Sequence, residues 1–113
     1  MSDPATLTPL RPVVFEIILI LSERPAHGYG IMKTLRERPA GRWVLGPGTL
    51  YRTLNEMRTL GIIEEAAPES DSEPARRRLY RLTGFGRKVG AAETRRMESL
   101  VAQARSASLL EGH

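Results

Sequence analysis

The sequence predicts a mainly α-helical fold with one small β-hairpin and a long C-terminal helix. Apolar residues recur at helical spacing in three successive segments before residue 60. Two short apolar segments, near residues 63 and 80, enclose a stretch of turn-forming residues, which is the pattern of a hairpin. A fourth helical pattern then begins at residue 83. With 113 residues, the chain has room for one domain with its own core and for no second domain.

The first helix is expected over residues 10–21. Its apolar positions repeat every three or four residues, at Leu10, Val13, Val14, Ile17, Ile18 and Leu21. Pro9 or Pro12 suits the first turn of such a helix, where a missing N–H costs no hydrogen bond. Because Phe15, Leu19 and Ile20 are also apolar, the helix is hydrophobic nearly all round and should be covered on more than one side. We expect a second subunit to supply part of this cover.

Two further helices are expected before residue 60. Pro25 interrupts the first pattern, and a shorter helix begins near Tyr29 and ends before Pro39. A third helix begins at residues 46–49 (Gly-Pro-Gly-Thr) and keeps one apolar face, formed by Leu50, Leu54 and Met57. Gly61 follows its last turn and is expected to end it in a left-handed conformation.

A hairpin is expected after the third helix. Residues 62–64 predict its first strand, residues 66–75 a loop with two prolines, and residues 78–82 its second strand. Three helices followed by a hairpin make a winged helix-turn-helix domain, which we place at residues 9–82. The residues before it, 1–8, are expected to be a flexible N-terminus.

The C-terminal helix is expected over residues 83–110, with Thr83 as its N-cap and residues 111–113 as a tail. Its seam positions alternate in fours and threes, as in a coiled coil, at Glu93, Met97, Leu100, Ala104 and Ala107. At 1.5 Å per residue such a helix is about 40 Å long, more than so small a domain can cover. The pattern therefore predicts a dimerisation helix. Three glycines are expected to weaken its first turns, namely Gly84, Gly86 and Gly90.

Catalytic, cofactor and metal sites are not expected. The chain has no cysteine, which excludes thiol nucleophiles, disulfides and cysteine-based zinc sites. Its two histidines, His27 and His113, have no potential metal ligands at a suitable spacing. The acidic residues crowded between Glu64 and Glu73 lie in a turn-rich loop, which offers no cavity to shift a pKa. The lack of a long apolar run or a signal-peptide pattern predicts a cytoplasmic protein with no membrane segment.

The outward face of the third helix carries side chains that can read DNA. We expect this face to hold Thr49, Arg52, Asn55, Glu56 and Arg58, with Tyr51 at its boundary. Arginine can bind guanine through two hydrogen bonds, asparagine suits adenine, and hydroxyl groups can contact phosphates. The net charge of +4 suits a polyanionic partner. Many exposed helix faces carry similar residues, so this face alone is a weak signal.

The order of charges in the hairpin adds a second signal. Five acids and no base lie between Glu64 and Glu73, and six bases and no acid lie between Arg76 and Lys88. This segregation predicts a wing tip that binds phosphates. Its expected members are Arg76, Arg77, Arg78 and Arg81. The alternative is that the two runs pair with each other across the hairpin.

Three motifs of the chain resemble the PadR-like family of winged helix-turn-helix transcriptional regulators. The first joins residues 46–51 (Gly-Pro-Gly-Thr-Leu-Tyr) to residues 60–64 (Leu-Gly-Ile-Ile-Glu). The others are residues 27–31 (His-Gly-Tyr-Gly-Ile) and residues 77–83 (Arg-Arg-Leu-Tyr-Arg-Leu-Thr). Each motif is weak by itself, but their order and gaps make the resemblance specific. The single C-terminal helix is similar to that of the family's smaller subclass.

The resemblance implies a homodimeric repressor that binds a palindromic operator in double-stranded DNA and that a small hydrophobic effector could release. The third helix would then lie in the major groove and the wing along the backbone. Matching positions place Thr49, Tyr51 and Arg52 on the DNA, and we add Asn55 from the exposed face. The first and last helices would form the dimer interface. Its expected residues are Leu10, Val14, Ile17, Met97, Leu100, Val101 and Ala104.

The chain departs from the family pattern at two positions of the third helix. Gly46 stands where the family often has serine, and Arg52 stands where it often has proline. The last helix has no aromatic residue beyond Phe85, so a pocket that stacks flat drugs is not expected. We interpret Trp43 as a packing residue of the turn. The competing hypothesis for the whole chain is a winged-helix module that binds a protein and no DNA.

Overall fold

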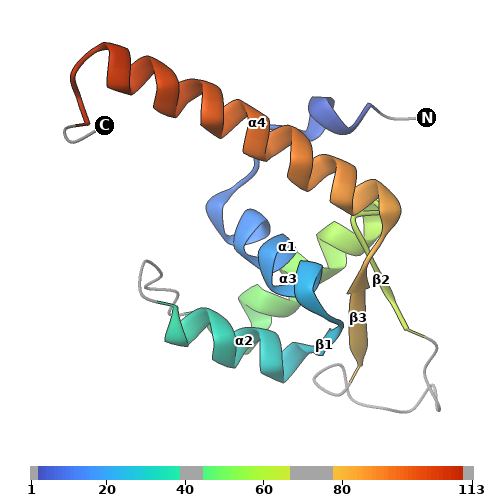
Figure 1. The fold of residues 1–113 in the computed structure, drawn as a ribbon. Helices are drawn as coiled ribbons and strands as arrows, with labels where there is room; N and C mark the ends of the chain where they lie inside the picture. Colours follow the sequence, from blue (N-terminus) through green and yellow to red (C-terminus); the bar gives the residue numbers. More distant parts are fainter. Residues whose placement is uncertain (1–2, 39–44, 67–77, 111–113) are drawn as a thin grey trace.

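The computed structural model describes residues 3–38, 45–66 and 78–110. Its elements follow the predicted order and confirm the mainly α-helical fold with a small sheet (Figure 1). They are η1 (Pro4–Leu7), α1 (Pro12–Glu23), β1 (Ala26–His27), α2 (Gly28–Glu37), α3 (Pro47–Thr59), β2 (Ile63–Glu65), β3 (Leu79–Leu82) and α4 (Gly84–Ser106). The predicted roles of Trp43, Arg76 and Arg77 fall outside the described residues.

The ends of α1 and α3 follow the expected local signals. Pro12 and Pro47 occupy the first positions of the two helices, where a proline removes no helical hydrogen bond. Gly61 ends α3 with a φ of 81°, a conformation that side chains other than glycine rarely adopt. Its N–H donates to the Arg58 carbonyl, and the Ile62 N–H donates to the Met57 carbonyl. These two bonds close the helix and turn the chain directly into β2.

The sheet has three antiparallel strands in the order β1-β3-β2. β2 and β3 are the predicted hairpin strands, and Glu64 and Glu65 lie opposite Arg81 and Tyr80. β1 was not predicted, because two residues are too few to show an alternating pattern. It pairs Ala26 with Tyr80 and so ties the start of α2 to the hairpin.

The core lies between α1, α2, α3, the sheet and the first half of α4. Its most deeply buried apolar residues include Ile17, Ile31, Leu50, Leu54 and Val89. The α1 helix is covered by α2, β3 and α4 of its own chain. Val14 and Ile17 were expected at the dimer interface, but their side chains are only 7% and 0% exposed. We correct this expectation, because side chains buried in their own core cannot reach a partner.

Within the described residues, the N-terminal segment forms the short 3₁₀ helix η1, and the flexibility expected of residues 1–8 stays a prediction. Asp3 accepts a hydrogen bond from the Ala5 N–H at 3.0 Å and so caps η1, which packs against α4 (Figure 1). After it, the Leu10 N–H donates to Glu93 Oε2 at 3.1 Å. Arg96 donates to both oxygens of Glu93, at 2.7 and 2.9 Å. Glu93 is 2% exposed, so this carboxylate joins the N-terminal segment to α4 from inside the fold.

We expect Glu93→Gln to lower the free energy of unfolding by about 1–3 kcal/mol near neutral pH, since the variant loses charged hydrogen bonds. The bonds from Arg96, and then the bond from Leu10, hold the pKa of Glu93 below its ordinary value of 4.5. A lowered folded pKa stabilises the protein at neutral pH, and this contribution is lost as the pH falls through that pKa.

The difference between parent and variant should therefore shrink in acid. Urea unfolding at about pH 7 and about pH 3 measures it. The control is Glu98→Gln, which changes an exposed carboxylate of the same helix. An equal effect of the two substitutions at neutral pH would contradict the role of Glu93.

The α4 helix is long but ends at Ser106, before the predicted residue 110. At 1.5 Å per residue, its length is roughly 35 Å. Ser108 adopts a left-handed conformation with a φ of 62° and turns the chain away. The second half of α4 extends beyond the other elements (Figure 1). Leu100 and Val101 are exposed there, while Met97 and Ala104 are half-buried.

Candidate nucleic-acid interface

The α3 helix presents a polar face opposite its apolar one. Leu50, Leu54 and Met57 are buried in the core. Thr49, Arg52 and Asn55 are exposed, as predicted. Helical geometry places these three residues together, because positions three apart share one face. The exposed face of α3 is therefore open to a partner along nearly two turns.

Tyr51 lies at the edge of this face and packs inward. It is half-buried and contacts the core cluster. Its ring lies so close to Gly28 at the start of α2 that a Cβ on this glycine would be 2.6 Å from Tyr51 Cε1. The close approach of α2 and α3 at this point therefore depends on the lack of a side chain at Gly28.

A chain of polar contacts joins α3 to the hairpin. Arg58 Nη2 donates to Asn55 Oδ1 at 2.8 Å, and Arg58 Nη1 donates to Glu65 Oε1 at 3.0 Å. Arg78 Nη1 also donates to Glu65 Oε1, at 3.3 Å. We call these four residues, Asn55, Arg58, Glu65 and Arg78, the hairpin network. The sequence showed Asn55 and Arg58 three residues apart, but gave no signal that Glu65 would meet them.

Two ion pairs show that the acidic and basic runs of the hairpin partly pair with each other. Arg78 pairs with Glu65, and Arg81 pairs with Glu64 at 2.7 Å. For these two arginines, pairing across the hairpin is confirmed. Burial and the Glu65 carboxylate raise the pKa of Tyr80, so its hydroxyl stays neutral beside the network. The Glu65 carboxylate therefore partly neutralises the charge that Arg78 could offer to a phosphate.

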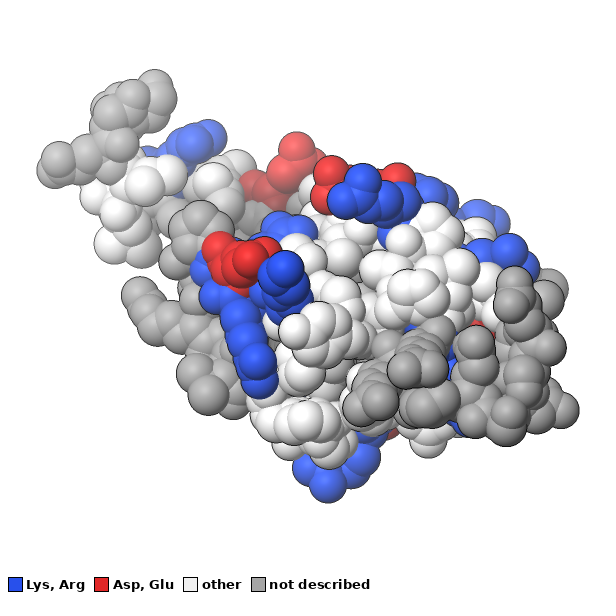
Figure 2. Space-filling model, turned by 90° about the horizontal axis from the view of Figure 1, so that it is seen from below, with Lys and Arg blue, Asp and Glu red and all other residues white. Residues whose placement is uncertain are grey.

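Charges on the face of α2 and the hairpin are mixed. Figure 2 shows this face, with basic side chains spread over it and acidic ones beside some of them. On the far edge of α3, Arg11 Nη2 lies 2.7 Å from Glu56 Oε2. Arg52 donates to Thr49 Oγ1 at 3.3 Å and makes no ion pair within the described part of the chain. Among the described residues, no acidic side chain therefore competes with a ligand for the charge of Arg52.

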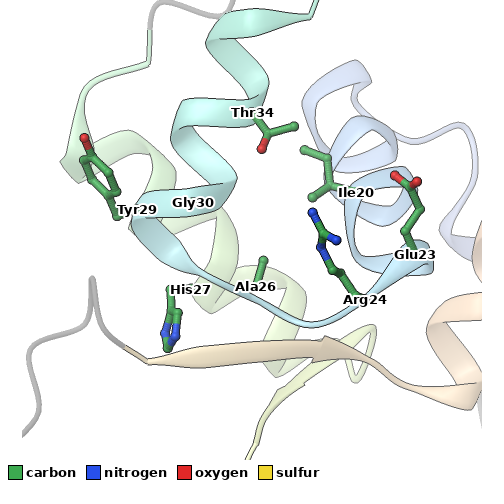
Figure 3. A pocket seen from close by; sticks show the side chains of 8 residues that line it. All are labelled: Ile20, Glu23, Arg24, Ala26, His27, Tyr29, Gly30 and Thr34. Carbon is green, nitrogen blue, oxygen red and sulfur yellow. The ribbon is translucent and has the colours of Figure 1, made fainter.

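A cavity of about 430 Å³ lies where α1, β1 and α2 meet (Figure 3). Its walls combine the apolar side chains of Ile20 and Ala26 with the charged groups of Glu23 and Arg24 and the Thr34 hydroxyl. The ring of Tyr29 points away from the cavity and is exposed. Neither Arg24 nor Tyr29 was predicted as a site residue. Arg24 follows the end of α1 and Tyr29 lies in the first turn of α2, on either side of β1.

Residues 3–38, 45–66 and 78–110 contain no group of three or more histidine, aspartate or glutamate side chains that could hold a metal ion. In the same ranges, no helix combines the length and the apolar character needed to cross a membrane. The chemistry that remains at the exposed α3 face is hydrogen bonding and charge. Such a face suits recognition of a polar, anionic surface.

Solved structures with the same fold include regulators from several bacteria. A PadR family transcription regulator from Clostridium difficile gives a TM-score of 0.69 at 26% identity, over 83% of this chain and 95% of that one. A PadR-like transcription factor from Bacteroides fragilis gives 0.70 at 26% identity, over 84% and 88%. Bacillus subtilis PadR in complex with operator DNA gives 0.57 at 21% identity, over 71% and 45%. At this identity, the similarity to Bacillus subtilis PadR shows a shared fold and nothing more.

No curated protein matches the chain. The model of the family described as "Transcriptional regulator PadR-like family" matches residues 17–92. This span runs from the middle of α1 into α4 and includes all of α2, α3 and the sheet. Since it makes up more than half of the 113 residues, the chain belongs to the PadR-like family of winged-helix transcriptional regulators, which are DNA-binding proteins and not enzymes.

Proposed function

We propose that the chain is a homodimeric repressor that binds a palindromic operator through α3. The observation that carries the proposal is the exposed α3 face, where Thr49, Arg52 and Asn55 lie together and Arg52 has no competing acidic partner among the described residues. Bacillus subtilis PadR, which has the same fold, has been seen on operator DNA. A winged helix of this kind places its recognition helix in the major groove. The predicted wing contacts of Arg76, Arg77 and Arg78 remain part of the proposal.

The proposed dimer interface is the second half of α4. Leu100 and Val101 are exposed there, and Met97 and Ala104 lie beside them. Phe15 and Leu19 are the large side chains of α1 that stay partly accessible, in place of Val14 and Ile17. Leu10 is half-buried near the same helix. A two-fold dimer would space two recognition helices about 34 Å apart, one turn of DNA.

A groove between α1 and α4 supports the proposal of a small hydrophobic effector. It has a volume of about 810 Å³ and is lined in part by Phe15, Met97, Val101 and Ala102. Apolar walls of this size suit a small organic molecule. Because the groove shares Met97 and Val101 with the proposed dimer interface, an effector there would change how two recognition helices are spaced.

The proposed function is tested by binding of the purified protein to its own upstream intergenic DNA. Unrelated DNA of equal length is the control, and each is measured at about 50 and about 200 mM salt. We expect tight binding confined to a palindrome, weaker at high salt but still selective. Equal weak binding to both DNAs would reject an operator in that region. Equal weak binding to a random duplex pool as well would favour a protein-interaction module.

Arg52→Ala should weaken binding to the operator by about 1–3 kcal/mol, because this side chain is placed to contact a base edge. It should leave the dimer intact, since α3 lies outside the proposed interface. The control is Lys88→Ala, which removes the same charge from the exposed surface of the first half of α4. Titrations with operator and non-specific DNA separate the two effects. Equal losses for both variants would reduce Arg52 to a general electrostatic role.

A further inference from the structure

We propose that Glu65 is a positioning residue for base reading. Through Arg58, it fixes the orientation of the Asn55 side-chain amide, so that Asn55 presents its NH₂ group to the DNA and favours guanine. The inference rests on the proposed function, since it assumes that α3 reads bases. It adds to the proposed function that Asn55 prefers guanine and that Glu65 causes this preference.

The contacts within the hairpin network carry the inference. Glu65 Oε1 accepts hydrogen bonds from Arg58 at 3.0 Å and from Arg78 at 3.3 Å. The second terminal nitrogen of Arg58 donates to Asn55 Oδ1 at 2.8 Å. Both terminal nitrogens of Arg58 are therefore engaged, one with the hairpin and one with α3. The side chain of Glu65 is only 19% exposed, so this contact is partly shielded from water and salt.

The chemistry of arginine fixes which end of the amide faces outward. A guanidinium has five N–H donors and no acceptor, so it can hold only the oxygen of an asparagine side chain. The Asn55 oxygen is turned toward Arg58, and its NH₂ group points to the other side. Asn55 is exposed, so this NH₂ group is available to a partner.

The orientation predicts a base. Reading adenine with asparagine needs the amide oxygen to accept from N6 while the amide nitrogen donates to N7. In this chain, that oxygen is turned toward Arg58 and already accepts one hydrogen bond from it, which leaves the NH₂ group as the outward end of the amide. Guanine instead presents two acceptors, N7 and O6, to the major groove. An amide that offers its donors suits guanine better than adenine, in contrast to the adenine contact expected from the residue type alone.

Glu64 provides a matched control within the same strand. It is the neighbouring carboxylate, and it also pairs with an arginine of β3, since Arg81 Nε lies 2.7 Å from its Oε2. Adjacent strand residues point to opposite faces, and Glu64 makes no hydrogen bond or ion pair with the described residues of α3. Its side chain is 50% exposed. Glu65→Gln and Glu64→Gln therefore change the net charge equally, but only the first removes the ionic contact with Arg58 on which the link to Asn55 depends.

The experiment selects bound DNA from a pool of duplexes with a randomised central segment, using the full chain. The proteins compared are the parent, Asn55→Ala, Glu65→Gln and Glu64→Gln, each checked for its midpoint of unfolding. We expect the parent to enrich guanine at one position per half-site and Asn55→Ala to lose that preference. Glu65→Gln should lower the same preference by about fivefold or more, because a lost bidentate contact costs at least that much discrimination. Glu64→Gln should leave it unchanged.

Each other result has a definite meaning. If the parent enriches no motif, the proposed function fails. If the parent enriches a motif but no position depends on Asn55, or that position prefers adenine, the inference is overturned and the function stands. The same holds if Glu65→Gln and Glu64→Gln give identical profiles. If Glu65→Gln does not fold, Arg58→Ala replaces it, since it removes the same link from the α3 side.

Discussion

Gly86→Ala is expected to destabilise the protein by about 3 kcal/mol or more, enough to unfold much of a marginally stable chain. A Cβ at this position would lie 2.1 Å from the Ile62 carbonyl oxygen and 2.7 Å from Leu82 Cδ1. The oxygen cannot easily retreat, because it accepts a hydrogen bond from the Thr83 N–H at 3.0 Å. The added methyl group would therefore force α4 away from the end of α3 and from β3 together.

Gly84→Ala is the matched control for this prediction. Gly84 lies two residues earlier in the same first turn of α4, and a Cβ there meets nothing within 4 Å. We expect a neutral or slightly stabilising change, within about 1 kcal/mol, because alanine favours helix more than glycine does. Urea midpoints of the two variants measure the difference. If both alanines stabilised the protein, helix propensity and not packing would govern this turn.

The role of Gly86 could not be predicted from the sequence. A glycine at a helix start appears only as a weak helix former, since local propensity carries no information about which backbone lies opposite. The helices were predictable because their apolar residues repeat with the helical period, and Gly61 because a glycine after a last turn has a known role. The two-residue strand β1 and the short η1 leave no period to detect. Their positions depend on tertiary contacts with β3 and α4.

The exposed residues of α3 were predictable from the sequence, but their contacts with the hairpin were not. Helical phase was enough to place Thr49, Arg52 and Asn55 on the outer face of α3. The same phase could not tell which subunit would cover α1, and so Val14 and Ile17 were misplaced. Alternation along β2 separates Glu64 from Glu65, but does not say which of the two faces α3. That choice depends on how the hairpin packs, and it decides which carboxylate reaches Arg58.

The exposed second half of α4 leads to the prediction with the largest effect on function. Leu100→Asp should convert the proposed homodimer into monomers, because a carboxylate buried without a partner costs on the order of several kcal/mol. Leu100 is 49% exposed in the single chain, so the substitution should leave the fold of one subunit nearly unchanged. Light scattering measures the mass of the particle in solution. A dimer that survives would place the interface elsewhere.

Loss of the dimer should weaken operator binding far more than the loss of any one base contact. Two linked recognition helices gain about 100-fold or more in affinity, since the second half-site is bound intramolecularly. A monomer loses that gain but keeps its base preference at one half-site. Leu60→Asp is the control, because Leu60 is 50% exposed but lies at the end of α3. It adds the same charge and should leave the dimer mass in solution unchanged. If only Leu100→Asp gives monomers, the dimer interface lies on α4.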